Sequence, residues 1–457
     1  MKVIVCGAGP VGIGIAEQLV NEGNDVTMIG ITESPLDKIK HKLDLNCVVG
    51  HPSHPSVLKS AGAEEADMII AVTDSDEINM VTSCLASNLF GVKKKIAHVR
   101  HHSYLGKYHD SIFSTDNFPI DLIISPEKEV AKAISNRLHV PGANETFLFA
   151  GDRLKVISVK FKKDSLVNRL TIAEANAKLS QNLKVKIFGF LRDQEFSLKS
   201  DIKLNQDDEI YLAADNEDIK EVLSLLGHDE SEARNIRIVG GGRVGYSLAK
   251  SLEENSDINL KIIESNEKRA QFLASHLPDV AIIHGDALEK EILREVNIEN
   301  SDMIISVSND DEVNILSSLL AKKFGCTKAI SLINSSSFAP LFSSLGIDVI
   351  VNPREISVSS ILRYTRDIKS RNVFSICEGQ AEIIETISYD NSYTSGKTLV
   401  ELKLPKGIEL AAIFRQGKTI IPKEDTVIEA GDNLIIVSYV SMLKKVEKIF
   451  SHKFKYV

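Results

Sequence analysis

A glycine-rich turn occurs twice in this chain, each time directly after a short apolar run. The first copy reads Cys6-Gly7-Ala8-Gly9-Pro10-Val11-Gly12, and the second reads Gly240-Gly241-Gly242-Arg243-Val244-Gly245. Their first glycines, at positions 7 and 240, lie 233 residues apart. A repeat at a fixed spacing marks a duplicated unit. The chain is therefore constrained to fold as two related halves, and each half helps to interpret the other.

Apolar strand-like runs alternate with helical patterns after each glycine turn. We expect strands at 1–6, 25–29, 45–49 and 66–72 in the first half, and at 236–239, 258–263, 280–283 and 302–307 in the second. The run at 66–72 is almost continuously apolar, as strands buried on both faces of a parallel sheet are. This alternation predicts an α/β fold with a Rossmann-like, doubly wound parallel sheet in each half.

The segment that follows each predicted sheet has the alternation of half-buried strands instead. We expect strands at 154–161, 185–191 and 209–212 in one segment, and at 381–387, 408–414 and 433–437 in the other. Each segment therefore predicts a small α+β domain. The domains are placed at 1–125, 140–227, 234–353 and 372–453, in the order large, small, large, small. The basic tail at 451–456 is expected to be solvated.

The composition is that of an ordinary globular protein, with 43% hydrophobic and 26% charged residues. A formal net charge of −9 argues against a general nucleic-acid binder, which needs a basic surface. No stretch reaches the roughly 18 apolar residues that a membrane span needs, and no secretory signal opens the chain. The five cysteines contain no CxxC pair and are expected to be reduced thiols. We therefore expect a cytoplasmic protein.

Glycines at three positions of a strand-to-helix turn are typical of a dinucleotide site. The first glycine allows the tight turn, the second lets a pyrophosphate approach the backbone, and the third permits close packing of helix on strand. The helix amino terminus then supplies amide donors for the phosphates. The alternative is a glycine-rich turn that holds nothing. The expected cofactor contacts are Gly7, Ala8, Gly9, Pro10, Val11 and Gly12 in the first copy, and Gly240, Gly241, Gly242, Arg243, Val244 and Gly245 in the second.

The two copies differ where an acid should contact the adenosine ribose, at the end of the second strand. Glu264 has this position in the second copy, and its charge would disfavour a 2′-phosphate, which predicts NAD rather than NADP. Gly30 stands there in the first copy. After the third strand, Asp286 in the second copy corresponds to His51 in the first, and His51 has the alternative of being only a polar loop residue.

Polar residues follow the fourth strand in both copies. Thr73 and Asp74 in the first half, and Ser308 and Asn309 in the second, precede a helix that such residues commonly cap. Because this loop lies at the carboxyl edge of the sheet, these four residues are also expected to face the ligand.

The fifth strand gives the sharpest contrast between the copies. Comparing 95–100 with 328–333 places His98 opposite Ser331 and Arg100 opposite Ile333. His98 and Arg100 would supply positive charge for an extra phosphate, which predicts a triphosphate such as ATP in the first site and a dinucleotide in the second. Arg100 has the alternative of a surface ion pair. The histidines at 98, 101, 102 and 109 lack cysteine partners and a fixed spacing, so no metal site is predicted.

The small segments offer no convergent His, Lys or Cys that would serve as an acid or base, so no catalytic residue is predicted. Binding without turnover is the favoured interpretation: the nucleotide shifts the arrangement of domains and so regulates a partner. An NAD-dependent oxidoreductase acting on a small metabolite is the alternative. A redox-sensing transcriptional regulator is a third class, but neither a DNA-reading helix nor a basic patch stands out.

Several motifs together resemble the RCK (regulator of potassium conductance) domain family in a duplicated arrangement. They are the two glycine turns, the run Gly-His-Pro-Ser-His-Pro at 50–55, His-Gly-Asp-Ala at 284–287, the Asp-Glu-x-Asn loops ending at Asn79 and Asn314, and Ser-Pro-Glu at 125–127. The resemblance spans nearly the whole chain. It implies tandem pairs of large and small RCK domains, NAD(H) bound in the large domains, and a homotetrameric ring whose shape ATP or ADP changes. It also implies a peripheral place on the inner face of the cell membrane, where the partner is a Trk-type potassium channel or transporter.

Overall fold

The computed structural model describes the chain except for residues 102, 107–108, 114–116, 139, 207, 254, 336–345, 366–369 and 451–457. The basic tail and His102 thus lie outside the described residues. The chain forms two compact units, Met1–Ser135 with Ala233–Thr365, and Asn136–Glu232 with Arg366–Val457. Each half of the sequence therefore contributes one segment to each unit, and the first unit holds both glycine turns.

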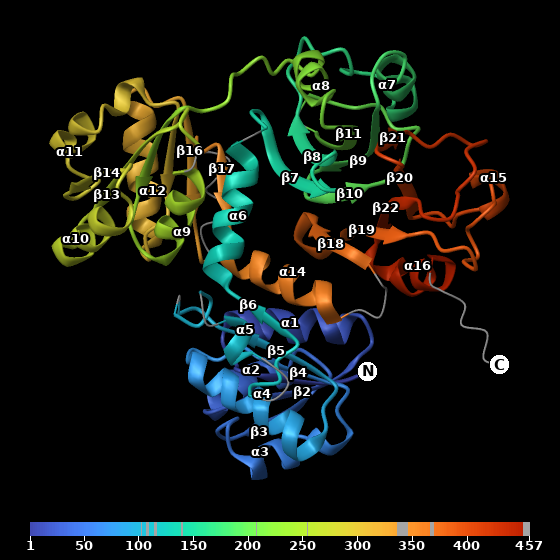
Figure 1. Cartoon of the computed structure of the whole chain (residues 1–457). Coiled ribbons are helices and arrows are strands. Elements are labelled where there is room, and N and C mark those ends of the chain that lie inside the picture. The colour runs from blue at the N-terminus through green and yellow to red at the C-terminus, as the bar shows by residue number, and fades with distance from the viewer. Residues whose placement is uncertain are drawn as a thin grey trace. The chain divides into compact units, whose positions relative to one another are not determined.

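The first large domain is a six-stranded parallel sheet in the order β3-β2-β1-β4-β5-β6 (Figure 1). Its strands are β1 Lys2–Cys6, β2 Asp25–Gly30, β3 Asn46–Val49, β4 Met68–Ala71, β5 Lys94–His98 and β6 Leu122–Ile124, and its helices are α1 Pro10–Asn21, α2 Glu33–Lys40, α3 Pro55–Ser60, α4 Asp76–Phe90, α5 His109–Ile112 and α6 Pro126–Leu138. The chain order reverses between β1 and β4, so the crevice of a doubly wound sheet opens beside the first glycine turn.

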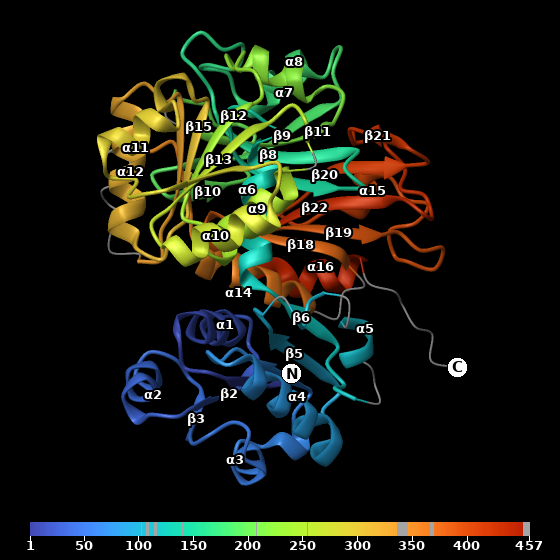
Figure 2. The ribbon, with the colours of Figure 1, turned by 60° about the vertical axis from the view of Figure 1, so that its left-hand side comes forward.

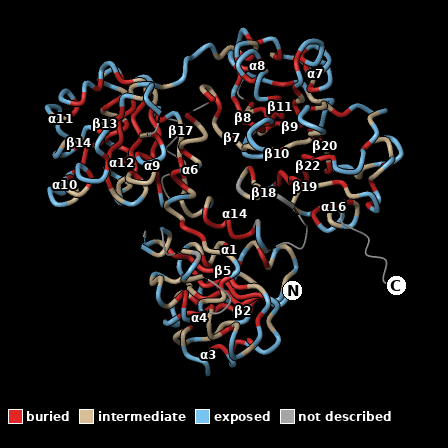
Figure 3. The backbone as a smooth tube through the Cα atoms, viewed as in Figure 1, coloured by how far each residue is buried: buried red, intermediate tan, exposed pale blue. Residues whose placement is uncertain are grey.

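Helices cover both faces of this sheet (Figure 2). One face packs on α1 and α2 through residues such as Ile15, Leu19 and Leu36. The other face packs on α3 and α4 through residues such as Leu58 and Ala86. The central strands are accordingly buried along their length, as Figure 3 shows. Burial on both faces explains the continuous apolar runs of the sequence.

The second large domain repeats this plan with the strand order β14-β13-β12-β15-β16-β17. Its strands are β12 Asn235–Val239, β13 Asn259–Glu264, β14 Ala281–His284, β15 Met303–Ser306, β16 Lys328–Leu332 and β17 Val349–Val351, and its described helices include α9 Arg243–Leu252, α10 Glu267–His276, α11 Lys290–Glu295, α12 Asp311–Lys323 and α14 Pro353–Thr365. The predicted α/β class and the duplication are confirmed, and the sheets also gain a short sixth strand each.

The last helix of the second large domain packs on the first. Val358, Ile361 and Leu362 of α14 belong to the buried core on the α1 side of the first sheet. Between the two equivalent helices, Ser360 of α14 donates a hydrogen bond of 2.9 Å to Glu129 of α6. The core of the first large domain is therefore completed by a helix that lies more than 200 positions later in the sequence.

Each half contributes a five-stranded antiparallel sheet to the second unit, in the orders β10-β9-β11-β8-β7 and β18-β19-β22-β20-β21. The first comprises β7 Ala143–Phe149, β8 Leu154–Lys160, α7 Ile172–Leu179, β9 Val185–Arg192, β10 Glu195–Ser197, β11 Glu209–Asp215 and α8 Ile219–Leu225, and the second comprises β18 Ser370–Ile376, β19 Ala381–Ile387, α15 Leu399–Leu402, β20 Ile408–Arg415, β21 Lys418–Ile420, β22 Asn433–Tyr439 and α16 Leu443–Phe450. Residues of both sheets, including Phe149, Phe196, Ile383 and Val437, form one shared apolar core.

A buried carboxylate paired with a partly exposed arginine holds the turn before the last long strand in each small domain. Asp432 is fully buried, and Arg415 donates two hydrogen bonds to its carboxylate, at 2.7 and 2.8 Å. Asp208 accepts two hydrogen bonds of 2.6 Å from Arg192 in the same way. The sequence analysis did not reveal this pairing, because the arginine and the aspartate lie 16 or 17 residues apart.

Candidate functional site

The first and third glycines of each turn are required by the backbone itself. Gly7 and Gly240 have φ angles of +121° and +96°, a region that side chains rarely tolerate. A Cβ at Gly12 would lie 1.9 Å from the Gly7 carbonyl oxygen, and one at Gly245 would lie 2.0 Å from that of Gly240. These four glycines therefore have the turn and packing functions that the motif predicts.

The middle glycines, Gly9 and Gly242, have no such internal cause. Each is the N-cap of the following helix, with φ angles of −79° and −60° that any residue adopts. A Cβ at either position would meet no atom within 4 Å. Neither conformation nor packing explains a glycine here. The open space in front of each turn is what a pyrophosphate would need in order to approach the backbone.

Each turn leads directly into a helix. Pro10 is the first residue of α1, where its missing N–H costs nothing, and Arg243 is the first residue of α9. Neither N-cap glycine has a side chain to accept hydrogen bonds from the first turn of its helix. Amide donors and the positive end of the helix dipole are thus available to an anion at both sites.

Glu264 anchors the second glycine turn. It is 9% exposed, and its carboxylate accepts hydrogen bonds of 2.8 Å from the backbone N–H groups of Gly241 and Asn266. A carboxylate offers about four acceptor positions, so two remain for ribose hydroxyls. This acid both positions the turn and stands where the ribose is expected.

Arg269 of α10 covers the same turn, a contact that the sequence did not reveal. Its guanidinium donates to the carbonyl oxygens of Gly241 at 2.6 Å and Gly242 at 3.2 Å. It also lies over the ring of Phe272, 4.5 Å from the ring centroid. Burial lowers the pKa of this guanidinium from its ordinary value. Arginine nevertheless keeps its positive charge in proteins.

The first copy fills the corresponding space differently. A Cβ at Gly30 would lie 3.0 Å from the Cβ of Ala8 and 3.1 Å from Leu36. At the matching positions, a Cβ at Gly241 would lie 2.1 Å from Leu273 and 3.0 Å from the Glu264 carboxylate, so this glycine leaves room for both side chains. The space beside the first turn is thus filled by Ala8 and Leu36, and the space beside the second by Leu273 and Glu264, so the first site has no acid at this point.

The loops after the third strands keep the predicted residues at the same edge of each sheet. Asp286 is exposed and accepts a hydrogen bond of 2.9 Å from the backbone of Leu288. His51 is half-buried, with its Nδ1 atom 2.7 Å from the Ser53 hydroxyl and its ring 5.0 Å from that of His54. Both loops are ordered by their own contacts.

Buried asparagines position the loops after the fourth strands. Asn79 accepts a hydrogen bond from the Thr73 N–H at 2.8 Å and donates to the carbonyl of His98 at 3.0 Å, and Asn314 does the same with Ser308 and Leu332. The helix caps are Ser75 and Asp310, whose side chains accept from the first turns of α4 and α12. They are not the residues directly after the strands. Asp74 and Asn309 are exposed at these loops.

The predicted alignment of the fifth strands is wrong by one residue. Met68 pairs with Lys94 in the first sheet, and Met303 pairs with Lys328 in the second. The two asparagine bonds just described also match His98 with Leu332. His98 therefore corresponds to Leu332 and not to Ser331, and Arg100 corresponds to Asn334 and not to Ile333. The segment from Met303 to Lys328 is one residue shorter than the segment from Met68 to Lys94, which changes the offset between the copies.

Aspartates that sequence reasoning missed fix the loops after the fifth strands. Asp76 accepts hydrogen bonds from the backbone N–H groups of Arg100 at 2.9 Å and His101 at 2.7 Å. Asp311 holds the second-copy loop in the same way. The Arg100 guanidinium itself lies 3.8 Å from the exposed carboxylate of Asp74, a weak pair in solvent. Arg100 is thus free to exchange this contact for a phosphate.

His98 cannot supply the positive charge that was expected of it. The side chain has no exposed surface, and neither ring nitrogen has a hydrogen-bond partner among the described residues. Burial lowers its pKa from the ordinary value to about 3, and the neighbouring Arg100 adds to the effect. The imidazole is therefore neutral at pH 7, and Arg100 is the cation at this strand end.

Replacing His98 by leucine, the residue at the matching position 332, should make the protein less sensitive to acid. Unfolded histidine titrates near 6.5, whereas folded His98 titrates at about 3. Between these values the unfolded chain binds a proton that the folded chain does not, so stability falls as the pH falls, by up to about 1.4 kcal/mol per pH unit. Scanning calorimetry at pH 7, 6 and 5 should show that His98→Leu loses less stability than the wild type, with the surface variant His41→Leu as control. An equal loss in both proteins would contradict this assignment.

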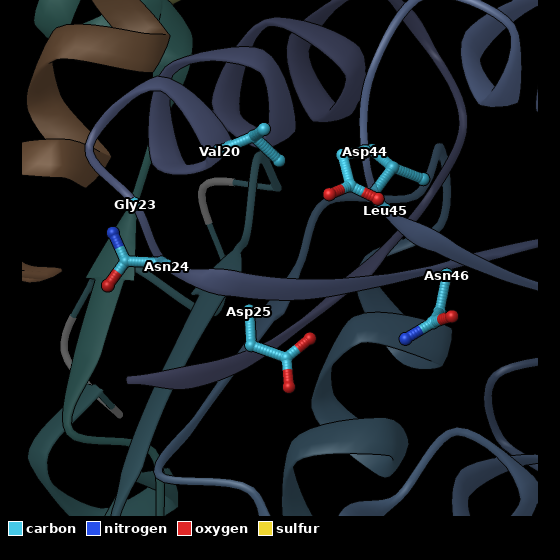
Figure 4. Close-up of a pocket in the computed structure, with 7 residues that line it drawn as sticks. All are labelled: Val20, Gly23, Asn24, Asp25, Asp44, Leu45 and Asn46. Atoms are coloured by element: carbon cyan, nitrogen blue, oxygen red, sulfur yellow. The ribbon is translucent and has the colours of Figure 1, made fainter.

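A surface pocket of about 380 Å³ lies in the first large domain, lined by Val20, Gly23, Asn24, Asp25, Asp44, Leu45 and Asn46 (Figure 4). These residues surround the end of α1 and the starts of β2 and β3. They therefore lie at the amino edge of the sheet, opposite the glycine turn, and this pocket is not the candidate nucleotide site.

Within the described ranges, His, Cys, Asp and Glu side chains form no group of three or more that could hold a metal ion. In the same part of the chain, no helix combines the length and the apolar character that crossing a membrane requires.

Family models match most of the two large domains and the second small domain. The TrkA-N domain matches residues 3–126 and 236–353, and the TrkA-C domain matches residues 385–451. Full-length relatives named Trk system potassium uptake protein TrkA are 38% identical over 452 residues in Azorhizobium caulinodans and 36% identical over 455 residues in Haemophilus influenzae, with 98% of each chain covered in both cases. A relative named TrkA homolog 1 in Methanosarcina mazei is 32% identical over 458 residues, with 98% of this chain and 100% of that protein covered.

Solved structures share the fold at lower identity. The structure titled GsuK Channel has a TM-score of 0.63 and 18% identity, and the similarity covers 98% of this chain and 78% of that one. The structure titled GsuK channel bound to NAD has a TM-score of 0.60 and 17% identity, covering 98% of this chain and 79% of that one. At this identity the likeness establishes the shared fold.

Proposed function

The chain belongs to the TrkA family of potassium uptake proteins, and we propose that it is the nucleotide-sensing regulatory subunit that gates a Trk-type channel or transporter in the membrane. The observation that carries the proposal is the open space in front of both middle glycines, Gly9 and Gly242, for which the protein itself has no use. Two such turns in one chain provide two places where a nucleotide could bias the arrangement of domains.

An enzymatic function is set aside by the family, whose members are regulatory subunits and not enzymes. This excludes the alternative of an NAD-dependent oxidoreductase. Sensing by binding requires only that the nucleotide prefer one arrangement of the domains over another, because a ligand with equal affinity for both shifts nothing.

We assign NAD(H) to the second site and ATP or ADP to the first. The carboxylate of Glu264 supports NAD(H) in the second site, because it retains free acceptor positions beside the second turn. The absence of an acid at Gly30 and the weakly paired Arg100 support ATP or ADP in the first site. That a GsuK channel of the same fold is described as bound to NAD agrees with a dinucleotide in this architecture.

The proposed contacts in each site are those at the carboxyl edges of the strands. In the first site they are Gly7, Ala8, Gly9, Pro10, Val11, Gly12, Gly30, His51, Thr73, Asp74, Arg100 and, as a neutral side chain, His98. In the second site they are Gly240, Gly241, Gly242, Arg243, Val244, Gly245, Glu264, Asp286, Ser308 and Asn309. We further propose domains at 1–125, 140–227, 234–353 and 372–453, a homotetrameric ring, and a peripheral position on the inner face of the cell membrane.

Thermal-shift titration of the full chain with NAD, NADH, NADP, ATP and ADP tests this proposal. A ligand at a hundredfold excess over its Kd should stabilise the site that it fills by about 2.7 kcal/mol. NAD should bind the second site more tightly than NADP, and Glu264→Gln should reduce this preference because the charge that repels a 2′-phosphate is gone. The exposed Glu267→Gln on α10 is the matched control. If no nucleotide shifted the transition, the sensing function would be refuted.

A further inference from the structure

The helix α14 brings a basic side chain from the second half of the chain onto the helix of the first glycine turn. The Nε and Nη2 atoms of Arg354 lie 3.2 and 3.4 Å from the position that a Cβ of Gly14 would occupy. The guanidinium therefore rests on the bare backbone of α1. Gly14 follows Pro10 by four residues, so both lie on one face of the helix, a single turn apart.

The Arg354 guanidinium has no hydrogen bond or ion pair within the described part of the chain; only its backbone N–H is engaged, with the side chain of Asn352 at 3.0 Å. The side chain is half-buried. The cation lies one turn into α1, on the face that Pro10 shares, and has no carboxylate partner among the described residues. Positive charge without a partner close to a helix amino end is unfavourable, and a bound anion would relieve the repulsion.

The equivalent helix of the first half, α6, approaches the second glycine helix in turn, but with an acidic side chain. Glu127 of α6 occupies the position that matches Arg354, because both follow a proline at the start of their helix. Its carboxylate lies 3.5 Å from Nη1 of Arg243, the first residue of the second glycine helix. An acid thus approaches the second site from the first half, while a base approaches the first site from the second half.

We propose that Arg354 is a phosphate-binding residue of the first nucleotide site, contributed by the other half of the chain. This inference rests on the proposed function of that site. Arg354 would favour nucleotides with more phosphate charge there, whereas at the second site the Glu127 carboxylate, 3.5 Å from Arg243, offsets part of the positive charge. Because α14 also closes the core on α1, a phosphate held by Arg354 links the ligand of the first half directly to an element of the second.

Calorimetric titration of the full chain tests the inference, with Gly242→Asp present to block the second turn. On this background we expect Arg354→Gln to weaken ATP binding about tenfold, the size of one charge-assisted contact. AMP, with one phosphate, should lose less than ATP. Arg354→Lys should restore most of the ATP affinity because it keeps the charge. Lys128→Gln, which removes an exposed cation from the equivalent helix α6, should change nothing.

The outcomes separate this inference from the function on which it rests. If Arg354→Gln bound ATP as tightly as the background chain and melted at the same temperature, the inference would be wrong while the nucleotide site stood. If lysine at 354 failed to restore the affinity that glutamine lost, the effect would be structural, and the inference would again be wrong. If the background chain bound no nucleotide, the proposed function of the first site and the inference would both be refuted.

Discussion

Aspartate in place of Gly9 should leave the protein folded and remove nucleotide binding at the first turn. Gly9 is the N-cap of α1, has a φ angle of −79° and faces open space. Aspartate is among the best N-cap residues, so the helix should be as stable as before or stabilised by up to about 1 kcal/mol. Its carboxylate would occupy the amide donors that a phosphate needs and would repel the phosphate charge. We expect affinity at this site to fall at least about a hundredfold, measured by calorimetry with ATP.

Two variants of the same turns make this result specific. Gly242→Asp should remove binding at the second turn alone, so the two substitutions together should abolish all nucleotide binding. Gly12→Ala should instead destabilise the fold, because its Cβ would lie 1.9 Å from the Gly7 carbonyl oxygen. A Gly9→Asp chain that melts normally and binds ATP with wild-type affinity would show that this turn is a packing feature and not a binding site.

Asparagine in place of Asp432 should strongly destabilise the second small domain. The carboxylate of Asp432 is fully buried and accepts hydrogen bonds from Arg415 at 2.7 and 2.8 Å and from the Glu429 N–H at 2.8 Å. Asparagine removes the negative charge and with it the charge-assisted hydrogen bonds from Arg415, at a cost of about 2 to 3 kcal/mol, while the partly exposed Arg415 keeps its contact with Glu429. Differential scanning calorimetry of the full chain should show a transition at lower temperature.

The duplication supplies the matched comparison. Asp208→Asn breaks the equivalent pair with Arg192 in the first small domain and should cost a similar amount. Asp425, exposed in the loop before β22, should tolerate asparagine without effect. Equal melting temperatures for Asp432→Asn and Asp425→Asn would mean that the buried pair contributes nothing measurable to stability.

The sequence was sufficient to predict the two parallel sheets because their signals are local. A buried strand is a run of apolar residues, and a glycine turn is a fixed string of letters. All four edge strands of the small domains were missed: β10 and β21 have three residues each and too few alternations to register, and β7, of seven residues like β18, buries only every third residue. The correspondence between the equivalent strands β5 and β16 was missed for another reason. Only the pairing of each with its neighbouring strand reveals that the segment before it differs in length between the copies.

The candidate site was predictable to the extent that its residues stand directly after strands. Glu264 and Gly30 could be compared because they end equivalent strands, and the structure adds that Gly30 lies against Ala8 and Leu36 whereas Gly241 leaves room for Leu273 and Glu264. Arg269 and Arg354 could not be found in this way, since they reach the turns from helices whose packing is set by the tertiary fold. The neutrality of His98 likewise depends on its burial, which cannot be read from the identity of the residue.

Potassium flux measured with the membrane subunit reconstituted in vesicles tests the central claim most directly. With the full chain bound on the outside of the vesicles, the account predicts that adding ATP or NADH changes the flux, and that a chain carrying both Gly9→Asp and Gly242→Asp still binds the membrane subunit but no longer transmits the nucleotide effect. A flux that responds to nucleotide equally with the wild type and with the double variant would contradict it, as would a flux that never responds.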